Sequence, residues 1–157
     1  PDLRQVLLGA AKAEDLTVHD GGTYVCMEGP LFSTVAESNL YRSWGASIIG
    51  MTAIPEAKLA REAEMCYACL ALATDYDVWN EDDHVDVEMV IANLMANSAN
   101  AQKVMRRVIG DIPLGTEESS EAYTALKNAI ITSPDKIPAW TRENLAILVE
   151  KYLPPST

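Results

Sequence analysis

Two aspartates one residue apart, Asp75 and Asp77, are the side chains whose type and spacing point most directly to chemistry. They follow a short apolar run, Met65 to Ala73, which is typical of a buried strand, although its period also fits a buried helix segment. In an open α/β sheet, ligands bind beyond the carboxyl ends of the strands. The spacing therefore predicts a site for a polar ligand. The alternative is that both aspartates form a turn and cap the next helix.

The composition indicates one acidic domain. The chain has 157 residues, of which 48% are hydrophobic, and its net charge is −11, from 12 Lys and Arg against 23 Asp and Glu. This charge argues against nucleic acid or an anionic membrane as a partner, but a few local donors can still bind a small phosphate-bearing ligand. No run approaches the roughly 18 apolar residues of a membrane span, and the first residues lack the apolar segment of a signal peptide. We therefore expect a cytoplasmic location.

The cysteine pattern does not indicate a disulfide scaffold. There are three cysteines, Cys26, Cys66 and Cys69, and an odd number in a chain of this length favours a reducing compartment. Cys66 and Cys69 have the spacing of a redox pair, but they lie inside the apolar run rather than at a helix start, so we interpret them as core residues. Their role stays open. No spacing of His, Cys, Asp and Glu resembles a metal site, so we predict none.

Helices and strands are expected to alternate along the first half of the chain. We expect helices over 2–14, 35–44, 86–107, 119–130 and 139–152, one helix starting at Pro55, and strands over 23–27, 46–50 and 65–73. Thr34 and Glu37 have the capping-box spacing, and Gly45 ends the second helix. This alternation predicts an α/β fold with parallel neighbouring strands. Three strands are few for six helices, so we expect more sheet outside this sequence.

Three motifs, in this order, resemble those of the methylthioadenosine phosphorylases, which belong to the trimeric branch of the purine nucleoside phosphorylase family. They are Glu28-Gly29-Pro30-Leu31-Phe32-Ser33-Thr34, Gly50-Met51-Thr52-Ala53-Ile54-Pro55-Glu56 and Ala73-Thr74-Asp75-Tyr76-Asp77. The resemblance runs from Asp2 to Asn128. One departure is Leu31, where the family often has arginine.

The resemblance implies a phosphorylase-type α/β sandwich, a mixed sheet flanked by helices, of which this chain supplies only the carboxyl-terminal strands and helices. Residues 1–157 would then be the carboxyl-terminal portion of a single nucleoside phosphorylase domain, with the amino-terminal portion absent from this sequence. That amino-terminal half would be its partner, and complete units would form a homotrimer. The chain alone is expected to be inactive.

The activity that the resemblance implies is a pentosyl transfer in purine and methionine salvage. Family members split 5′-methylthioadenosine with inorganic phosphate into adenine and 5-methylthioribose 1-phosphate. Phosphate is the co-substrate, and no cofactor is implied.

The resemblance assigns one group of residues to the purine base. Asp75 would be the catalytic residue, approaching purine N7 as a protonated acid or through water. Asp77 would accept a hydrogen bond from the 6-amino group, and Tyr76 would line the site mainly through its backbone. Phe32 would pack on the base, and Ser33 beside it would help to set substrate preference.

A second group would bind the sugar and phosphate. Met51 would back the ribose, Thr52 would donate a hydrogen bond to phosphate, and Val87 and Val90 would wall the methylthio pocket. The alternatives are that Met51 and the two valines are ordinary core and that Thr52 is a helix cap.

Two other functions remain open at this point. A 6-oxopurine nucleoside phosphorylase would use the same chemistry, but Asp75 and Asp77 count against it. A non-catalytic nucleoside-binding or scaffold subunit is the alternative from another class, because half of the family's site is absent from the sequence.

Overall fold

A computed structural model describes residues 3–80, 86–113 and 120–154. The chain forms two units. The unit that we call the sheet unit consists of Asp2–Ile54 and Ala68–Ile112, and the one that we call the tail unit contains Pro55–Tyr67 and Pro113–Thr157. Each unit is described by itself.

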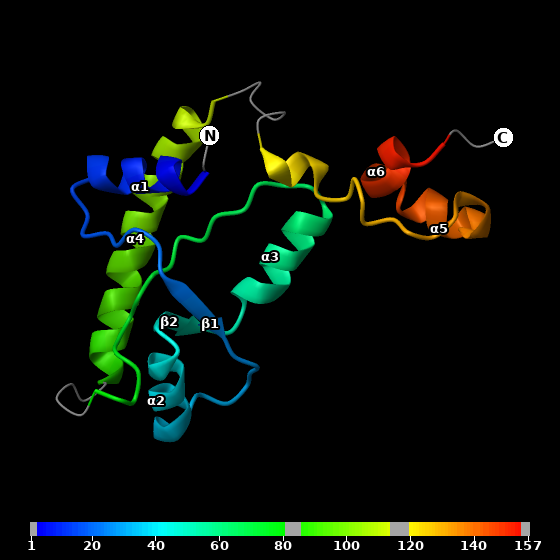
Figure 1. The fold of residues 1–157 in the computed structure, drawn as a ribbon. Coiled ribbons are helices and arrows are strands. Elements are labelled where there is room, and N and C mark those ends of the chain that lie inside the picture. The colour runs from blue at the N-terminus through cyan, green and yellow to red at the C-terminus, as the bar shows by residue number, and fades with distance from the viewer. Residues whose placement is uncertain (1–2, 81–85, 114–119, 155–157) are drawn as a thin grey trace. The chain divides into compact units, whose positions relative to one another are not determined.

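The sheet unit contains a parallel pair of strands, β1 (Thr23–Cys26) and β2 (Ala46–Gly50), in which Cys26 lies opposite Gly50 (Figure 1). The α/β class predicted from the alternation is therefore confirmed, and the strands are parallel as expected. Helix α2 (Val35–Ser43) connects them, since two parallel strands need a crossover connection between them.

Local signals set both ends of α2. The hydroxyl of Thr34 accepts the N–H of Glu37 at 3.3 Å, and the Glu37 carboxylate accepts the N–H of Thr34 at 2.7 Å. These two bonds form the predicted capping box. The Glu37 carboxylate accepts from the N–H of Thr34 and also from its hydroxyl, and both bonds lower the pKa of Glu37. At the other end Gly45 has a φ of 79°, a left-handed conformation that glycine adopts without a Cβ clash.

The core of the sheet unit lies where α1 (Leu3–Ala13) crosses α4 (Val87–Asp111) (Figure 1). Ala10 and Ala11 of α1 face Val104 and Val108 of α4, and all four are almost fully buried. Small alanines allow the helix backbones to approach, and burying each valine contributes roughly 1.5–3 kcal/mol. None of the helices described here is long and apolar enough to cross a membrane.

The prediction of a third strand over Met65–Ala73 is wrong for this structure. Within the described residues no strand pairs with this segment, and a strand exists only where its backbone groups join a ladder. Ala68 and Leu70 instead pack against the α1–α4 core. Met65, Tyr67 and Leu72 of the segment are exposed. An apolar run by itself does not show whether it lies in a sheet, in a helix or against helices.

The tail unit is mostly helical. It contains most of α3 (Ala53–Glu62), followed later in the chain by η2 (Glu121–Thr124), η3 (Pro134–Lys136), α5 (Ala139–Asn144), α6 (Ala146–Val149) and η4 (Glu150–Tyr152). Helix α3 begins before Pro55, so the predicted start at Pro55 is two residues late. Proline is tolerated there because N–H groups of the first turn have no partner within the helix.

Two predicted helices of the tail unit are shorter or broken. In place of a helix over 119–130, the residues described there form the 3-10 turn η2 and further turns. The N–H of Leu126 donates to the Glu64 carboxylate at 2.9 Å, so it is not available to an α-helix. The helix predicted over 139–152 breaks at Leu145, whose φ of −102° and ψ of 8° leave the helical region.

The two cysteines of the apolar run are not core residues, contrary to the sequence-based interpretation. Cys69 is exposed, whereas Cys66 is half-buried and its thiol donates to Ser120 Oγ at 3.2 Å. The interpretation as core residues assumed that the run is a buried strand, whereas no described strand pairs with it.

Candidate active site

Asp77 is held in place by two donors of the sheet unit. The hydroxyl of Ser33 is shared between its two oxygens at 3.1 and 3.2 Å, and the N–H of Val78 donates to Oδ1 at 2.9 Å. Ser33 is only 8% exposed, so this bond lies away from most competing water. The orientation of Asp77 is therefore set without any ligand.

Asp75 has a different environment. It is exposed, and the hydroxyl of Thr74 donates to Oδ2 at 2.6 Å. Tyr76, between the two aspartates, is also exposed, and its ring meets Trp79 edge-on at 5.9 Å between centroids. Of the two carboxylates, Asp75 is thus the one open to a ligand and Asp77 the one already engaged by protein donors.

Two further segments meet this loop at the carboxyl edge of the sheet. Phe32 and Ser33 follow β1, and Met51 and Thr52 follow β2, so parallel pairing brings both loops to the same edge. They touch, because a Cβ placed on Gly29 would lie 3.3 Å from the Met51 sulfur. The contact from Ser33 to Asp77 then joins the third segment to this edge.

The apolar residues assigned to ligand binding are largely open to solvent. Phe32 is 83% exposed and Val87 70% exposed, whereas Val90 and Met51 are half-buried. Val87 is therefore not an ordinary core residue of the sheet unit. Thr52 is exposed and directly precedes α3, which is the position of a helix cap, so that alternative stays open.

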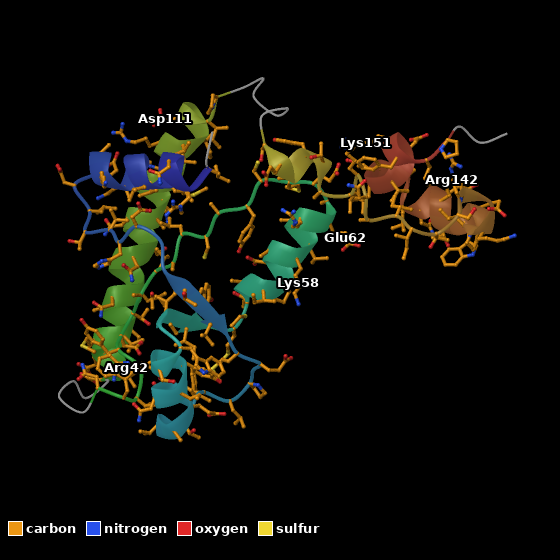
Figure 2. The ribbon with its side chains drawn as sticks, viewed as in Figure 1. Arg42, Lys58, Glu62, Asp111, Arg142 and Lys151 are labelled. Carbon is orange, nitrogen blue, oxygen red and sulfur yellow. The ribbon has the colours of Figure 1, made fainter. Side chains whose placement is uncertain are left out.

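Three residues that shape the loop were missed by the sequence analysis. Asn93 and Asn97 of α4 donate their side-chain amides to the carbonyl oxygens of Thr74 and Ala73, each at 2.7 Å. Arg42 of α2, which is labelled in Figure 2, lies over the Trp79 ring at 3.7 Å from its centroid. The only sequence signal was two asparagines four residues apart on a helix, and their acceptors are backbone atoms, which a sequence motif does not reveal.

Metal binding finds no support among the described residues. No three His, Cys, Asp or Glu side chains gather there as a metal ion requires. The described side chains at this edge offer carboxylates, hydroxyls and apolar surface.

Comparison with known proteins defines the class. Residues 1–110 match the family model of the phosphorylase superfamily. With its α/β layers and its polar carboxyl edge, the chain belongs to this superfamily.

Within this superfamily, the chain is similar to individual proteins of known name. The chain is 56% identical over 99% of its length to the S-methyl-5'-thioadenosine phosphorylase of Synechocystis sp. and 52% identical over 97% to that of Geobacter sulfurreducens. It spans about half of these relatives, 49% and 53% of their lengths.

Among solved structures, the chain is likewise similar to methylthioadenosine phosphorylases. A methylthioadenosine phosphorylase sourced from an Antarctic soil metagenomic library matches with a TM-score of 0.82 and 44% identity, covering 94% of this chain and 53% of that one. The Schistosoma mansoni methylthioadenosine phosphorylase in complex with adenine matches with a TM-score of 0.65 and 31% identity, covering 77% of this chain and 50% of that one.

Proposed function

We propose that a full-length protein carrying these 157 residues is a methylthioadenosine phosphorylase. It cleaves 5′-methylthioadenosine with inorganic phosphate to adenine and 5-methylthioribose 1-phosphate, in purine and methionine salvage. The observation that carries the proposal is the 56% identity to a named S-methyl-5'-thioadenosine phosphorylase across 99% of the chain. The paired carboxylates at the carboxyl edge of the sheet suit this chemistry.

The reaction needs a group that stabilises the departing base. As the glycosidic bond breaks, negative charge builds on the purine and positive charge on the sugar, so a donor at N7 lowers the barrier. Asp75, exposed and one residue from the held Asp77, takes this role, either protonated or through water. Asp77 accepts from the 6-amino group, since a carboxylate can only accept there.

The surrounding residues bind the rest of the substrate. Phe32 packs on the base beside Ser33, and the backbone at Tyr76 lines the site. Met51 backs the ribose, and Thr52 binds the phosphate co-substrate. Val87 and Val90, in the first turn of α4, wall the methylthio group, and no further cofactor takes part.

The same proposal includes a partner. The amino-terminal half found in the longer relatives would supply the rest of the site, and complete units would form a homotrimer in the cytoplasm. Support comes from the exposed apolar side chains along α4, since a face this apolar is rarely left in water. Four of them, Val87, Ile91, Leu94 and Met95, follow helical spacing along one face.

The test is Asp75→Asn in the full-length protein, with Asp111→Asn at the carboxyl end of α4 as matched control. Turnover of methylthioadenosine should fall on the order of a hundredfold or more, with a shift toward 6-oxopurine nucleosides, because an amide can donate to a carbonyl oxygen. Asp111→Asn should change neither quantity.

Three other results would contradict parts of this proposal. An unmodified full-length protein that prefers inosine over methylthioadenosine would instead be a 6-oxopurine phosphorylase. One that binds nucleoside without phosphate-dependent turnover would be a binding or scaffold subunit. Phosphorolysis by the isolated 157-residue chain would contradict the proposed dependence on a partner half.

A further inference from the structure

We propose that Asn93 and Asn97 are positioning residues that hold the Asp75–Asp77 loop in its catalytic geometry. We call this pair the asparagine clamp. The inference rests on the proposed function, in which Asp75 meets the purine base, and it adds to that function two residues that touch neither the base nor the phosphate.

The geometry of the clamp follows from helical spacing. Asn93 and Asn97 are four residues apart on α4, so both side chains lie on one face of the helix. Their amide nitrogens donate to consecutive carbonyls of the loop, Asn97 to Ala73 and Asn93 to Thr74, each at 2.7 Å. Two bonds from one rigid helix fix both the position and the direction of the backbone that enters the loop.

The clamp acts where the loop has few other restraints. No strand of the described structure pairs with residues 65–73, so the Ala73 and Thr74 carbonyls find side-chain donors instead of a ladder. A carbonyl can only accept, so each asparagine must present its NH2 group. An aspartate of the same shape could not make either bond.

The clamp is connected to Asp75 through one residue. Asn93 holds the Thr74 carbonyl, and the Thr74 hydroxyl donates to Asp75 Oδ2 at 2.6 Å. Ser33 holds Asp77 at the other end of the loop. The amino-terminal side of the acid pair thus depends on α4, and the carboxyl-terminal side on the loop after β1.

The experiment uses Asn93→Asp and Asn97→Asp in the full-length protein. The matched control is Gln102→Glu, the same amide-to-carboxylate change at an exposed position of the same helix. Three quantities are measured: amide hydrogen exchange over residues 73–80 without nucleoside, kcat with methylthioadenosine, and KM for phosphate. The exchange measurement needs no activity, so it tests the clamp even if the proposed function fails.

Loss of either clamp bond should speed exchange at Val78 and Asn80, whose N–H groups are bonded within the loop. The kcat should fall about ten- to a hundredfold, as expected when a catalytic group is misplaced by about an ångström. The KM for phosphate should stay within about twofold, since Thr52 lies on another loop, and Gln102→Glu should match the unmodified protein.

Unchanged exchange in both aspartate variants would overturn the clamp. Faster exchange with an unchanged kcat would overturn its positioning role. If the added charge prevents folding, Asn93→Ala and Asn97→Ala remove the donors without adding a charge, and the same two results decide.

Discussion

At the scale of single residues, the two aspartates of one short motif have different partners. Asp77 accepts from a buried serine and a backbone N–H, whereas Asp75 is exposed with one neighbouring hydroxyl. A fixed acceptor suits recognition of an amino group, and an open carboxyl suits proton donation to a leaving base. The division of roles that we propose follows from this asymmetry.

The methylthio pocket that we propose at Val87 and Val90 gives the sharpest prediction for one side chain. Transfer of a methylthio group into an apolar cavity gains roughly 1–2 kcal/mol over a hydroxyl. Val87→Gln places a polar amide in that wall. The ratio of kcat/KM for methylthioadenosine over adenosine should therefore fall about ten- to a hundredfold.

Val35→Gln is the matched control for this measurement. Val35 is the first residue of α2, as Val87 is of α4, and both are exposed. The control should leave the ratio unchanged. Equal losses for both substrates in Val87→Gln, with a lower melting temperature, would show that Val87 only packs.

At the scale of secondary structure, the parallel pair depends on a close approach across β1 and β2. A Cβ on Gly50 would lie 2.1 Å from the Tyr24 hydroxyl oxygen and 2.9 Å from its ring carbon Cζ. An alanine at position 50 must therefore displace the ring of Tyr24. A rigid ring moves away less easily than the end of a flexible side chain.

Gly50→Ala should therefore lower the free energy of unfolding by about 1–3 kcal/mol, the usual cost of overpacking. Gly110→Ala in α4 meets no atom within 4 Å and should raise it by about 0.5–1 kcal/mol, because alanine favours a helix. Chemical denaturation of both variants measures the difference. A neutral Gly50→Ala would mean that Tyr24 turns away without cost.

At the scale of the whole molecule, each unit contains its own ion pair between residues far apart in the sequence. In the sheet unit Arg107 of α4 pairs with Glu14 beyond α1 at 2.9 Å. In the tail unit Glu64 is the common partner of two segments: it accepts from the N–H of Leu126 and, in η4, from the Lys151 ammonium and the Tyr152 hydroxyl.

The Glu64 contacts predict an acid-sensitive tail unit. Desolvation raises the pKa of Glu64, but the bonds from Lys151, Tyr152 and the Leu126 N–H outweigh it and lower the pKa to about 2 from 4.5. Because the folded state prefers the ionised form, this stabilisation is present above about pH 4.5 and is lost as the pH falls toward 2.

Glu64→Gln should lower the melting temperature at neutral pH and flatten its pH dependence between about 4.5 and 2. The control is Glu62→Gln, on the exposed face of α3 (Figure 2). Lys151→Met should raise the pKa of Glu64, which an NMR titration of the carboxyl group would report. A Glu64 pKa near 4.5 in the unmodified protein would contradict this account.

The sequence by itself determined the features whose causes are local. The capping box of Thr34 and Glu37, the long α4 and the alternation of β1, α2 and β2 all follow from spacing within a few residues. The Asp75–Asp77 motif likewise indicated the family, because its residue types are visible without a fold.

Only the tertiary structure decided which groups meet. Ser33 reaches Asp77 across 44 positions, and Leu126 gives its N–H to Glu64 across 62, which turns a predicted helix into a 3-10 turn. The run Met65–Ala73 has a strand-like composition but no described strand beside it. Local preferences amount to fractions of a kcal/mol per residue, so a hydrogen-bond partner brought close by the fold outweighs them.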